Sequence, residues 1–189
     1  GAINTVGNID GDINKTTFYG NKANNGSGGA INTTGTINNI LNSSEFSINS
    51  ASGDGGAINT GSIIGNIDKG VFFLNTSDTG NGGAINTTDG MTGTLSNTTF
   101  LLNEATSGSG GAINTTGSLS DILNSKFSLN TAGANGGAIA ASSISGDISG
   151  SNFLSNRAGG LGGALYIDDV LNISVTSGKT SEFSNNRDS

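Results

Sequence analysis

Two neighbouring carboxylates, Asp168 and Asp169, are the residues of this chain that come nearest to a catalytic pair. Glycoside-cleaving enzymes hold two carboxylates about 5–9.5 Å apart, one on each side of the bond that breaks. Adjacent residues of a strand point to opposite faces, so this pair would not converge on one bond. The sequence contains no histidine, which excludes a Ser-His-Asp triad. We therefore expect that the protein is not an enzyme, and we interpret the pair as a solvated strand end.

A second candidate for chemistry is a short row of oxygen-bearing side chains near the N-terminus. Asn8, Asp10, Asp12 and Asn14 stand at every second position, so an extended strand would place them on one face. Calcium binds such oxygens, but it takes about six to eight of them from converging directions, which a flat row does not offer. The row also does not recur along the chain. Asp10 and Asp12 are thus weak candidate metal ligands, and we expect neither a bound metal nor a cofactor.

The elements that position these carboxylates and amides belong to a repeat. The tetrapeptide Gly-Gly-Ala-Ile recurs throughout the chain. Successive copies are 26 to 28 residues apart and lie at residues 28–31, 55–58, 82–85, 110–113 and 136–139. A sixth copy at 162–165 ends in leucine, and the chain opens within another at Gly1-Ala2-Ile3. A period of this size is typical of a solenoid, in which one unit cannot bury its apolar side chains alone. No linker interrupts the repeat, so we interpret residues 1–189 as a single domain, a segment of a longer passenger or fibre.

One repeat unit predicts three strands separated by three corners. Residues 30–34 alternate, with Ile31 inward and Ala30, Asn32 and Thr34 outward. Residues 36–41 form the second strand, and residues 45–49 the third, in which Phe46 and Ile48 share a face. In other units the apolar pairs of the second strand are Ile9/Ile13, Ile63/Ile67, Met91/Leu95, Leu119/Leu123 and Ile144/Ile148. Glycine interrupts the chain every eight to ten residues, and serine, threonine and asparagine are poor residues for a helix interior, which argues against helices.

A Phe-x-x-Asn motif recurs in step with the glycines, and parallel stacking would align its residues in two columns. The phenylalanines would form one aromatic stack from Phe18, Phe46, Phe72, Phe100, Phe127, Phe153 and Phe183. The asparagines would form a ladder at a corner from Asn21, Asn49, Asn75, Asn103, Asn130, Asn156 and Asn186. Asparagine suits a corner because it tolerates the left-handed conformation and its amide can donate to the next rung. Both columns are interpreted as structural supports without chemistry.

The outward columns of the first strand form a regular polar surface, which we expect to be the binding surface. Its members are Asn32, Asn59, Asn86, Asn114, Thr34, Thr88 and Thr116. A flat array of asparagine and threonine at sheet spacing could bind a glycan, a protein or ice. An ice-binding surface requires a more uniform threonine lattice than these columns offer.

Composition limits the classes of partner. The net charge of −7 comes from scattered single carboxylates, and no cluster of lysine or arginine is present to neutralise phosphates. We therefore expect no nucleic-acid partner. No run of about eighteen apolar residues occurs, so we expect no membrane-spanning helix. Glycine, serine, threonine and asparagine are abundant, but apolar residues recur on schedule in every unit, which argues against disorder.

The pairing of GGA[ILV] with FxxN resembles the repeat of chlamydial polymorphic outer-membrane proteins and of related bacterial autotransporter passengers. The two motifs recur in phase over nearly all of the chain, in up to seven copies. This resemblance implies a right-handed parallel β-helix that is displayed on the cell surface and serves in adhesion.

We therefore expect an all-β, right-handed, three-faced parallel β-helix (β-solenoid) of about seven coils of about 27 residues. The expected protein is an extracellular segment at the bacterial cell surface, an adhesin-like and non-catalytic solenoid for display and attachment. Its partner would be a host-cell or neighbouring-cell receptor or glycan. The main alternative is a structural filament subunit that self-associates end to end, because both ends lie within the repeat and would expose strand edges. An ice-binding surface and a polysaccharide-degrading β-helix are the remaining alternatives.

Overall fold

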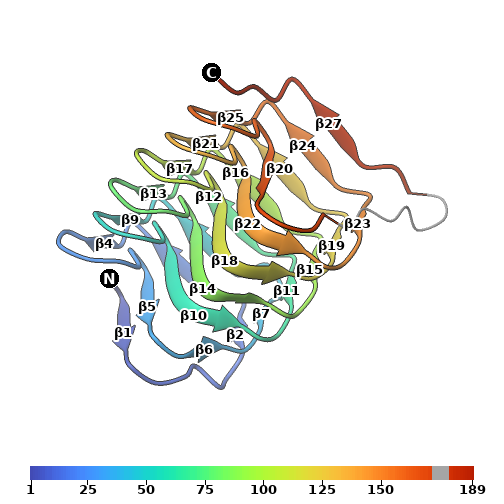
Figure 1. Ribbon diagram of the computed structural model, residues 1–189. Coiled ribbons are helices and arrows are strands. Elements are labelled where there is room, and N and C mark those ends of the chain that lie inside the picture. The colour runs from blue at the N-terminus through green and yellow to red at the C-terminus, as the bar shows by residue number, and fades with distance from the viewer. Residues whose placement is uncertain (172–178) are drawn as a thin grey trace.

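The chain folds as a parallel β-solenoid built from short strands (Figure 1). The computed structural model describes residues 1–171 and 179–189. Within these residues there is no helix, and strands of successive layers pair in parallel with partners 25 to 30 residues apart. The predicted all-β class and the parallel stacking are therefore confirmed.

The strands form four sheets, A to D, which run along the solenoid. Sheet A contains β1 (Ile3–Thr5), β5 (Ile31–Thr33), β10 (Ile58–Ile63), β14 (Ile85–Met91), β18 (Ile113–Leu119), β22 (Ile139–Ile144) and β26 (Leu165–Ile167), with β6 (Thr36–Ile37) also paired to β10. Sheet B contains β2 (Ile13–Asn14), β7 (Ile40–Leu41), β11 (Ile67–Asp68), β15 (Leu95–Ser96), β19 (Ile122–Leu123) and β23 (Ile148–Ser149).

The other two sheets complete each coil. Sheet C contains β3 (Thr17–Tyr19), β8 (Glu45–Ser47), β12 (Val71–Phe73), β16 (Thr99–Leu101), β20 (Lys126–Ser128), β24 (Asn152–Leu154) and β27 (Glu182–Ser184). Sheet D contains β4 (Lys22–Ala23), β9 (Ser50–Ala51), β13 (Thr76–Ser77), β17 (Glu104–Ala105), β21 (Thr131–Ala132) and β25 (Arg157–Ala158). Among the described residues, sheets A and C thus have seven layers and sheets B and D six, which makes about six complete turns.

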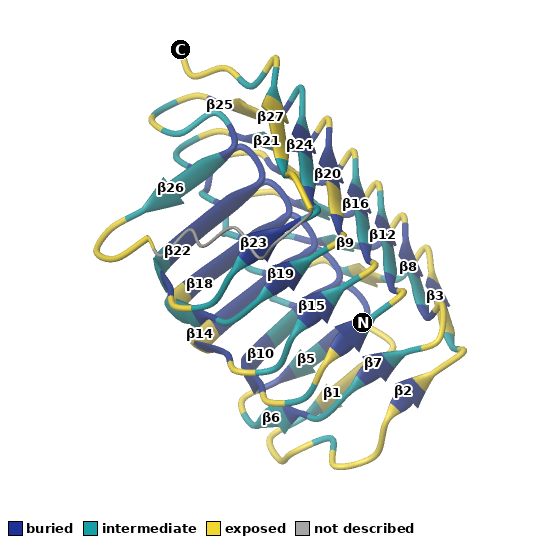
Figure 2. Cartoon of the chain, turned by 90° about the vertical axis from the view of Figure 1, so that its right-hand side faces the viewer, coloured by how far each residue is buried: buried dark blue, intermediate teal, exposed yellow. Residues whose placement is uncertain are grey.

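Sheet D was not among the three strands expected in each coil. Its strands are two residues long, too short for an alternating pattern to mark them in the sequence. Their inward position holds a small residue, such as Ala51, Ser77 or Ala105, which is buried without being a large apolar side chain. Figure 2 shows the buried residues as dark bands along the strands of sheets A, B and C.

The core is organised around a column of phenylalanine rings on sheet C. Neighbouring rings lie 4.6–4.9 Å apart between centroids, with their planes within 10° of parallel, from Phe18 to Phe183. The five middle rings are fully buried, whereas Phe183 is 44% exposed in the last layer. The spacing matches the distance between adjacent strands, so each ring stacks on the same residue of the next coil.

A column of asparagines, the inner asparagine ladder (Asn21, Asn49, Asn75, Asn103, Asn130, Asn156 and Asn186), runs beside the rings. In the middle of the ladder, the Nδ2 group of Asn103 donates to Oδ1 of Asn130 at 3.0 Å and to the carbonyl of Phe72 at 2.9 Å. Its Oδ1 accepts from the backbone N–H of Asn75 at 3.1 Å and from Nδ2 of Asn75 at 2.9 Å. Each buried amide thereby satisfies backbone groups at the corner as well as its neighbouring rung.

The left-handed residue of this corner is the one before the asparagine, and this corrects two expectations. Ile48 has a φ of +58° and Leu102 a φ of +57°, whereas no asparagine of the ladder has a positive φ. Ile48 is 43% exposed, so it does not share a face with the buried Phe46. The asparagine side chain must point inward to bond both adjacent layers, so the residue before it makes the turn. That residue's own side chain is directed outward, which leaves an exposed apolar column of Ile48, Leu74, Leu102 and Leu129.

The expected second strand, residues 36–41, is divided between two sheets. Ile37 pairs with Ile63 as the end of sheet A, and Ile40 pairs with Ile67 in sheet B. Ile37 and Ile40 are three positions apart, so a straight strand would point their side chains to opposite faces. The bend between them lets both side chains enter the core. In the fifth coil the core position belongs to Ile122, not to Leu123 as expected, because Leu95 pairs with Ile122.

The two glycines of each repeat have separate reasons to be glycine. Gly28 has a φ of +66°, a conformation that L-residues rarely adopt. A Cβ on Gly29 would lie 2.1 Å from the carbonyl oxygen of Gly56 in the next coil. The first glycine therefore makes the turn, and the second allows adjacent layers to approach.

Ala30 was expected to face outward, and this is wrong. Ala30 and its equivalents Ala57, Ala84, Ala112 and Ala138 are completely buried. The backbone N–H groups of Ala30 and Ile31 both donate to the carbonyl of Ala57, which shows that the chain bends here and that β5 begins only at Ile31. Strand alternation does not extend backward across such a bend, so both side chains enter the core.

Candidate binding surface along sheet A

The predicted asparagine column lies on the outer side of sheet A and forms a second set of hydrogen-bonded rungs. This outer asparagine ladder consists of Asn4, Asn32, Asn59, Asn86 and Asn114. From Asn32 onward, each Nδ2 donates to Oδ1 of the asparagine in the preceding coil at 2.8–2.9 Å. The middle rungs Asn32, Asn59 and Asn86 each keep one amide hydrogen and one oxygen lone pair for other partners.

The surface is more enclosed than the flat face that was expected. Asn86 is 5% exposed and Asn114 is 9% exposed. Loops that follow the sheet D strands stand beside this column, as the projecting loops after β9, β13 and β17 show in Figure 1. The outer ladder is therefore the floor of a groove with one high side, which we call the sheet A groove.

The high side is held by a further ladder that the repeat analysis missed. A serine or an Asx residue precedes the first five complete Gly-Gly-Ala-Ile copies, and these residues are Ser27, Asp54, Asn81, Ser109 and Asn135. Each side-chain oxygen accepts a backbone N–H from the equivalent loop of the next coil at 2.8–3.3 Å. The recurrence of a short polar residue before five successive Gly-Gly pairs was a signal for this ladder in the sequence. The loops are thus fixed to one another and give the groove a rigid side.

Three hollows follow the groove from the first coil to the last, with volumes of about 370, 130 and 350 Å³. The predicted binding residues that line them are Asn32, Thr34, Asn59, Thr88, Asn114 and Thr116. The first and third hollows also include loop residues, among them Ser27 and Asn135. The structure therefore brings these predicted residues together with side chains from the loops.

The threonine column is exposed, but its hydroxyl hydrogens are already used. Thr34 donates to the carbonyl of Val6 at 3.0 Å, and Thr88 donates to the carbonyl of Gly61 at 3.4 Å. Thr116 donates to the carbonyl of Thr88. These hydroxyls can accept hydrogen bonds from a ligand while they keep their backbone contact, so the column acts as a set of oriented acceptors.

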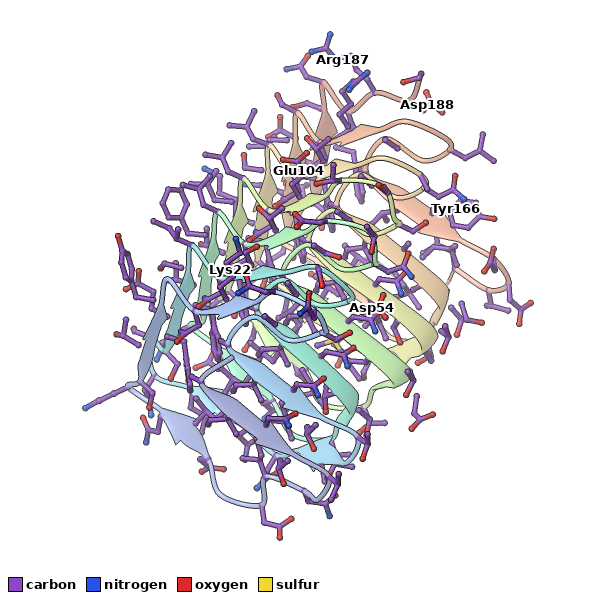
Figure 3. All side chains as sticks on the ribbon, turned by 90° about the vertical axis from the view of Figure 1, so that its left-hand side faces the viewer. Lys22, Asp54, Glu104, Tyr166, Arg187 and Asp188 are labelled. Carbon is purple, nitrogen blue, oxygen red and sulfur yellow. The ribbon has the colours of Figure 1, made fainter. Side chains whose placement is uncertain are left out.

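The acidic pair lies at the last layer of the groove. Asp168 and Asp169 follow β26, are both exposed, and pair through their backbone N–H groups with Ala141 and Ser142. The hydroxyl of Tyr166 donates to the carboxylate of Asp168, and this hydrogen bond is the main reason why the pKa of Tyr166 is raised. Tyr166 projects from the end of sheet A in Figure 3. Asp168 thus belongs to a tyrosine–carboxylate pair that lines the third hollow.

The expected metal candidates are engaged in contacts within the protein. Oδ1 of Asp12 accepts from Nδ2 of Asn39 at 2.8 Å, and the backbone carbonyl of Asp10 accepts from Nδ2 of Asn38 at 3.2 Å. In residues 1–171 and 179–189, no group of three or more His, Cys, Asp or Glu side chains is arranged to hold a metal ion.

We predict that chelation with EDTA leaves the melting temperature unchanged to within about 1 °C. A metal that binds only the folded state raises the melting temperature, so its removal by EDTA would lower it. Differential scanning calorimetry with and without EDTA measures this. Asp12→Asn keeps an accepting oxygen for Asn39 and serves as the control. A fall of several degrees that calcium restores would contradict the prediction and assign a metal site to Asp10 and Asp12.

A comparison with known families identifies the repeat. Residues 15–34 match the Chlamydia polymorphic membrane protein (Chlamydia_PMP) repeat. Residues 15–34 are thus similar to a polymorphic membrane protein repeat. The matched segment holds Phe18 and Asn21 of the Phe-x-x-Asn motif together with the following Gly-Gly-Ala-Ile. No curated protein and no solved structure matches the chain.

This repeat and the fold together indicate the broad class of the protein. The match to this repeat and the β-solenoid fold are both typical of a surface-associated protein of the autotransporter type. Among the described residues, no helix has the length and apolar character needed to cross a membrane.

Proposed function

We propose that this solenoid is an extracellular, non-catalytic passenger segment that attaches a bacterial surface to a receptor or glycan on a host or neighbouring cell. We assign attachment to the sheet A groove. The observation that carries this proposal is the groove itself: outward asparagines and threonines, fixed by two ladders, recur in successive coils beside a rigid row of loops.

A rigid repeated surface is suited to attachment because little conformational entropy is lost when a partner binds. The rungs of the outer ladder are held by their neighbours before binding, so the cost of ordering them has been met on folding. Equivalent groups also recur with the strand spacing of about 4.8 Å. Several weak contacts made by one extended partner can then add up to firm attachment.

The test places bulky charged side chains in the groove without disturbing the core. Thr88 and Thr116 are exposed, and the double variant Thr88→Arg/Thr116→Arg should reduce attachment of protein-coated beads to cultured cells by at least about tenfold. The control is Thr17→Arg/Thr99→Arg, which adds the same charge on the outer side of sheet C. Equal attachment by both variants would contradict the assignment of the groove.

A second candidate function is end-to-end association of copies into a filament. An apolar hollow of about 500 Å³ lies at the last layer and is lined by Leu165, Leu171 and Phe183. Another coil of the same kind would cover it and extend the phenylalanine stack. Sedimentation velocity should then show association that rises with concentration and is lost in Leu171→Glu. A parent chain that stays monomeric at all concentrations would remove this candidate.

A further inference from the structure

The outer asparagine ladder is interrupted at one position in the sheet A groove. Asn114 pairs in register with Ala140, and Ala140 pairs with Tyr166. The amide that would continue the ladder is therefore replaced by a methyl group, and an aromatic ring follows one layer later. The third hollow, with a volume of about 350 Å³, lies at this interruption, which we call the notch. Its volume falls within the range of about 300–1,000 Å³ that is usual for small-molecule sites.

The notch collects polar groups that have capacity for a ligand. Nδ2 of Asn114 donates to Asn86, but Oδ1 of Asn114 has lost the rung that would have donated to it. Oδ1 of Asn135 accepts from the backbone of Leu161 at 2.9 Å, so its Nδ2 group remains available as a donor. The Ser142 hydroxyl also lines the notch and makes no hydrogen bond within the described residues. Donors and acceptors are thus present side by side.

Tyr166 and Asp168 complete the notch at its other end. Both residues line the hollow, and the hydrogen bond between them restricts the orientation of the ring and of the carboxylate. The carboxylate keeps further lone pairs with which it can accept from a ligand. The ring offers an apolar face next to the methyl group of Ala140. Figure 3 shows the Tyr166 side chain projecting from the ribbon, and the residue is partly exposed.

We propose that the notch is a carbohydrate subsite that binds one neutral pyranose unit of a glycan. A pyranose presents hydroxyls that both donate and accept, which matches Asn114 Oδ1, Asn135 Nδ2 and Ser142, and a C–H face that can pack on Tyr166. An anionic ligand is disfavoured by Asp168 and by the net charge of −7. A cationic ligand would leave the Asn135 amide without an acceptor. The inference rests on the proposed attachment function and names its ligand class.

The test is saturation-transfer NMR with the methyl glycosides of glucose, galactose, mannose and N-acetylglucosamine. The probes with opposite charges are N-acetylneuraminic acid and methylguanidine. We expect the parent chain to bind at least one neutral glycoside weakly, with a Kd of about 1 mM, because one sugar makes few contacts. Binding of either charged probe in preference to every neutral glycoside would overturn the proposal.

Ala140→Asn is the decisive variant, because its amide would donate to Asn114 and restore the ladder while it fills the notch. It should weaken glycoside binding by at least about tenfold, without a fall in melting temperature. Tyr166→Ala should also weaken glycoside binding, because it removes the ring on which the C–H face of the sugar packs. Thr99→Asn on sheet C is the control and should leave binding unchanged. Undiminished binding in both Ala140→Asn and Tyr166→Ala would overturn the proposal.

The two proposals can fail separately. Beads coated with Thr88→Arg/Thr116→Arg that attach as well as their sheet C control contradict the attachment function, whatever the glycoside titration shows. A parent chain that binds none of the neutral glycosides contradicts the carbohydrate subsite alone. Both proposals are supported together if Ala140→Asn loses glycoside binding and beads coated with Thr88→Arg/Thr116→Arg attach less well than beads coated with the sheet C control.

Discussion

Replacing Phe100 with alanine should lower the free energy of unfolding by about 3–5 kcal/mol. Phe100 is fully buried and stacks on Phe72 at 4.7 Å and on Phe127 at 4.8 Å. The backbone on both sides is fixed by sheet C, so the coil cannot collapse into the space that the ring leaves. The loss therefore includes the transfer of the ring out of the core, the cavity, and the contacts of two neighbouring rings. Urea denaturation of the variant and the parent measures the difference.

Two controls show whether the loss arises from the position of Phe100. Thr34→Ala on the outer side of sheet A should cost well under about 1 kcal/mol, since that side chain is exposed. Phe183→Ala should cost less than Phe100→Ala, because Phe183 is 44% exposed and has a ring on one side only. Equal losses for Phe100→Ala and Thr34→Ala would contradict the inward stack.

Replacing Asn103 with alanine should cost about 2–6 kcal/mol, from groups that remain buried without partners. The substitution removes the amide that donates to the Phe72 carbonyl and the oxygen that accepts from the backbone N–H of Asn75. Each of these two backbone groups then loses its bond to the ladder, at about 1–3 kcal/mol each. Thermal and urea unfolding both report the loss.

The matched control is Asn32→Ala in the outer ladder. Asn32 also makes a rung on each side, with Asn4 at 2.8 Å and with Asn59 at 2.9 Å, but its surroundings are partly exposed. Water can replace these bonds, so the cost should stay below about 1 kcal/mol. If Asn103→Ala and Asn32→Ala lowered the free energy of unfolding by the same amount, burial of the inner ladder would add nothing to its stability, and the argument for Asn103 would be wrong.

The sequence by itself determined the period, the parallel stacking and the members of the phenylalanine column and the inner asparagine ladder. When the same residue returns every 26 to 28 positions, stacking places each copy above the last, and sheet spacing then sets the distance between copies. Phe100 could be placed between Phe72 and Phe127 on this ground alone. The paired Gly-Gly-Ala-Ile and Phe-x-x-Asn motifs also pointed to the polymorphic membrane protein repeat, which the match at residues 15–34 confirms.

Only the tertiary structure decided what happens at the corners. Alternation predicts the direction of a side chain within a strand, but it fails wherever the chain bends, as at Ala30, Ile40 and Ile48. The direction of those side chains depends on φ values that the packing of neighbouring coils imposes. The sheet A groove has the same origin, since its enclosed shape comes from loops held beside Asn86 and Asn114 by contacts one full repeat away. Such contacts follow from the relative position of coils, which a single repeat unit does not encode.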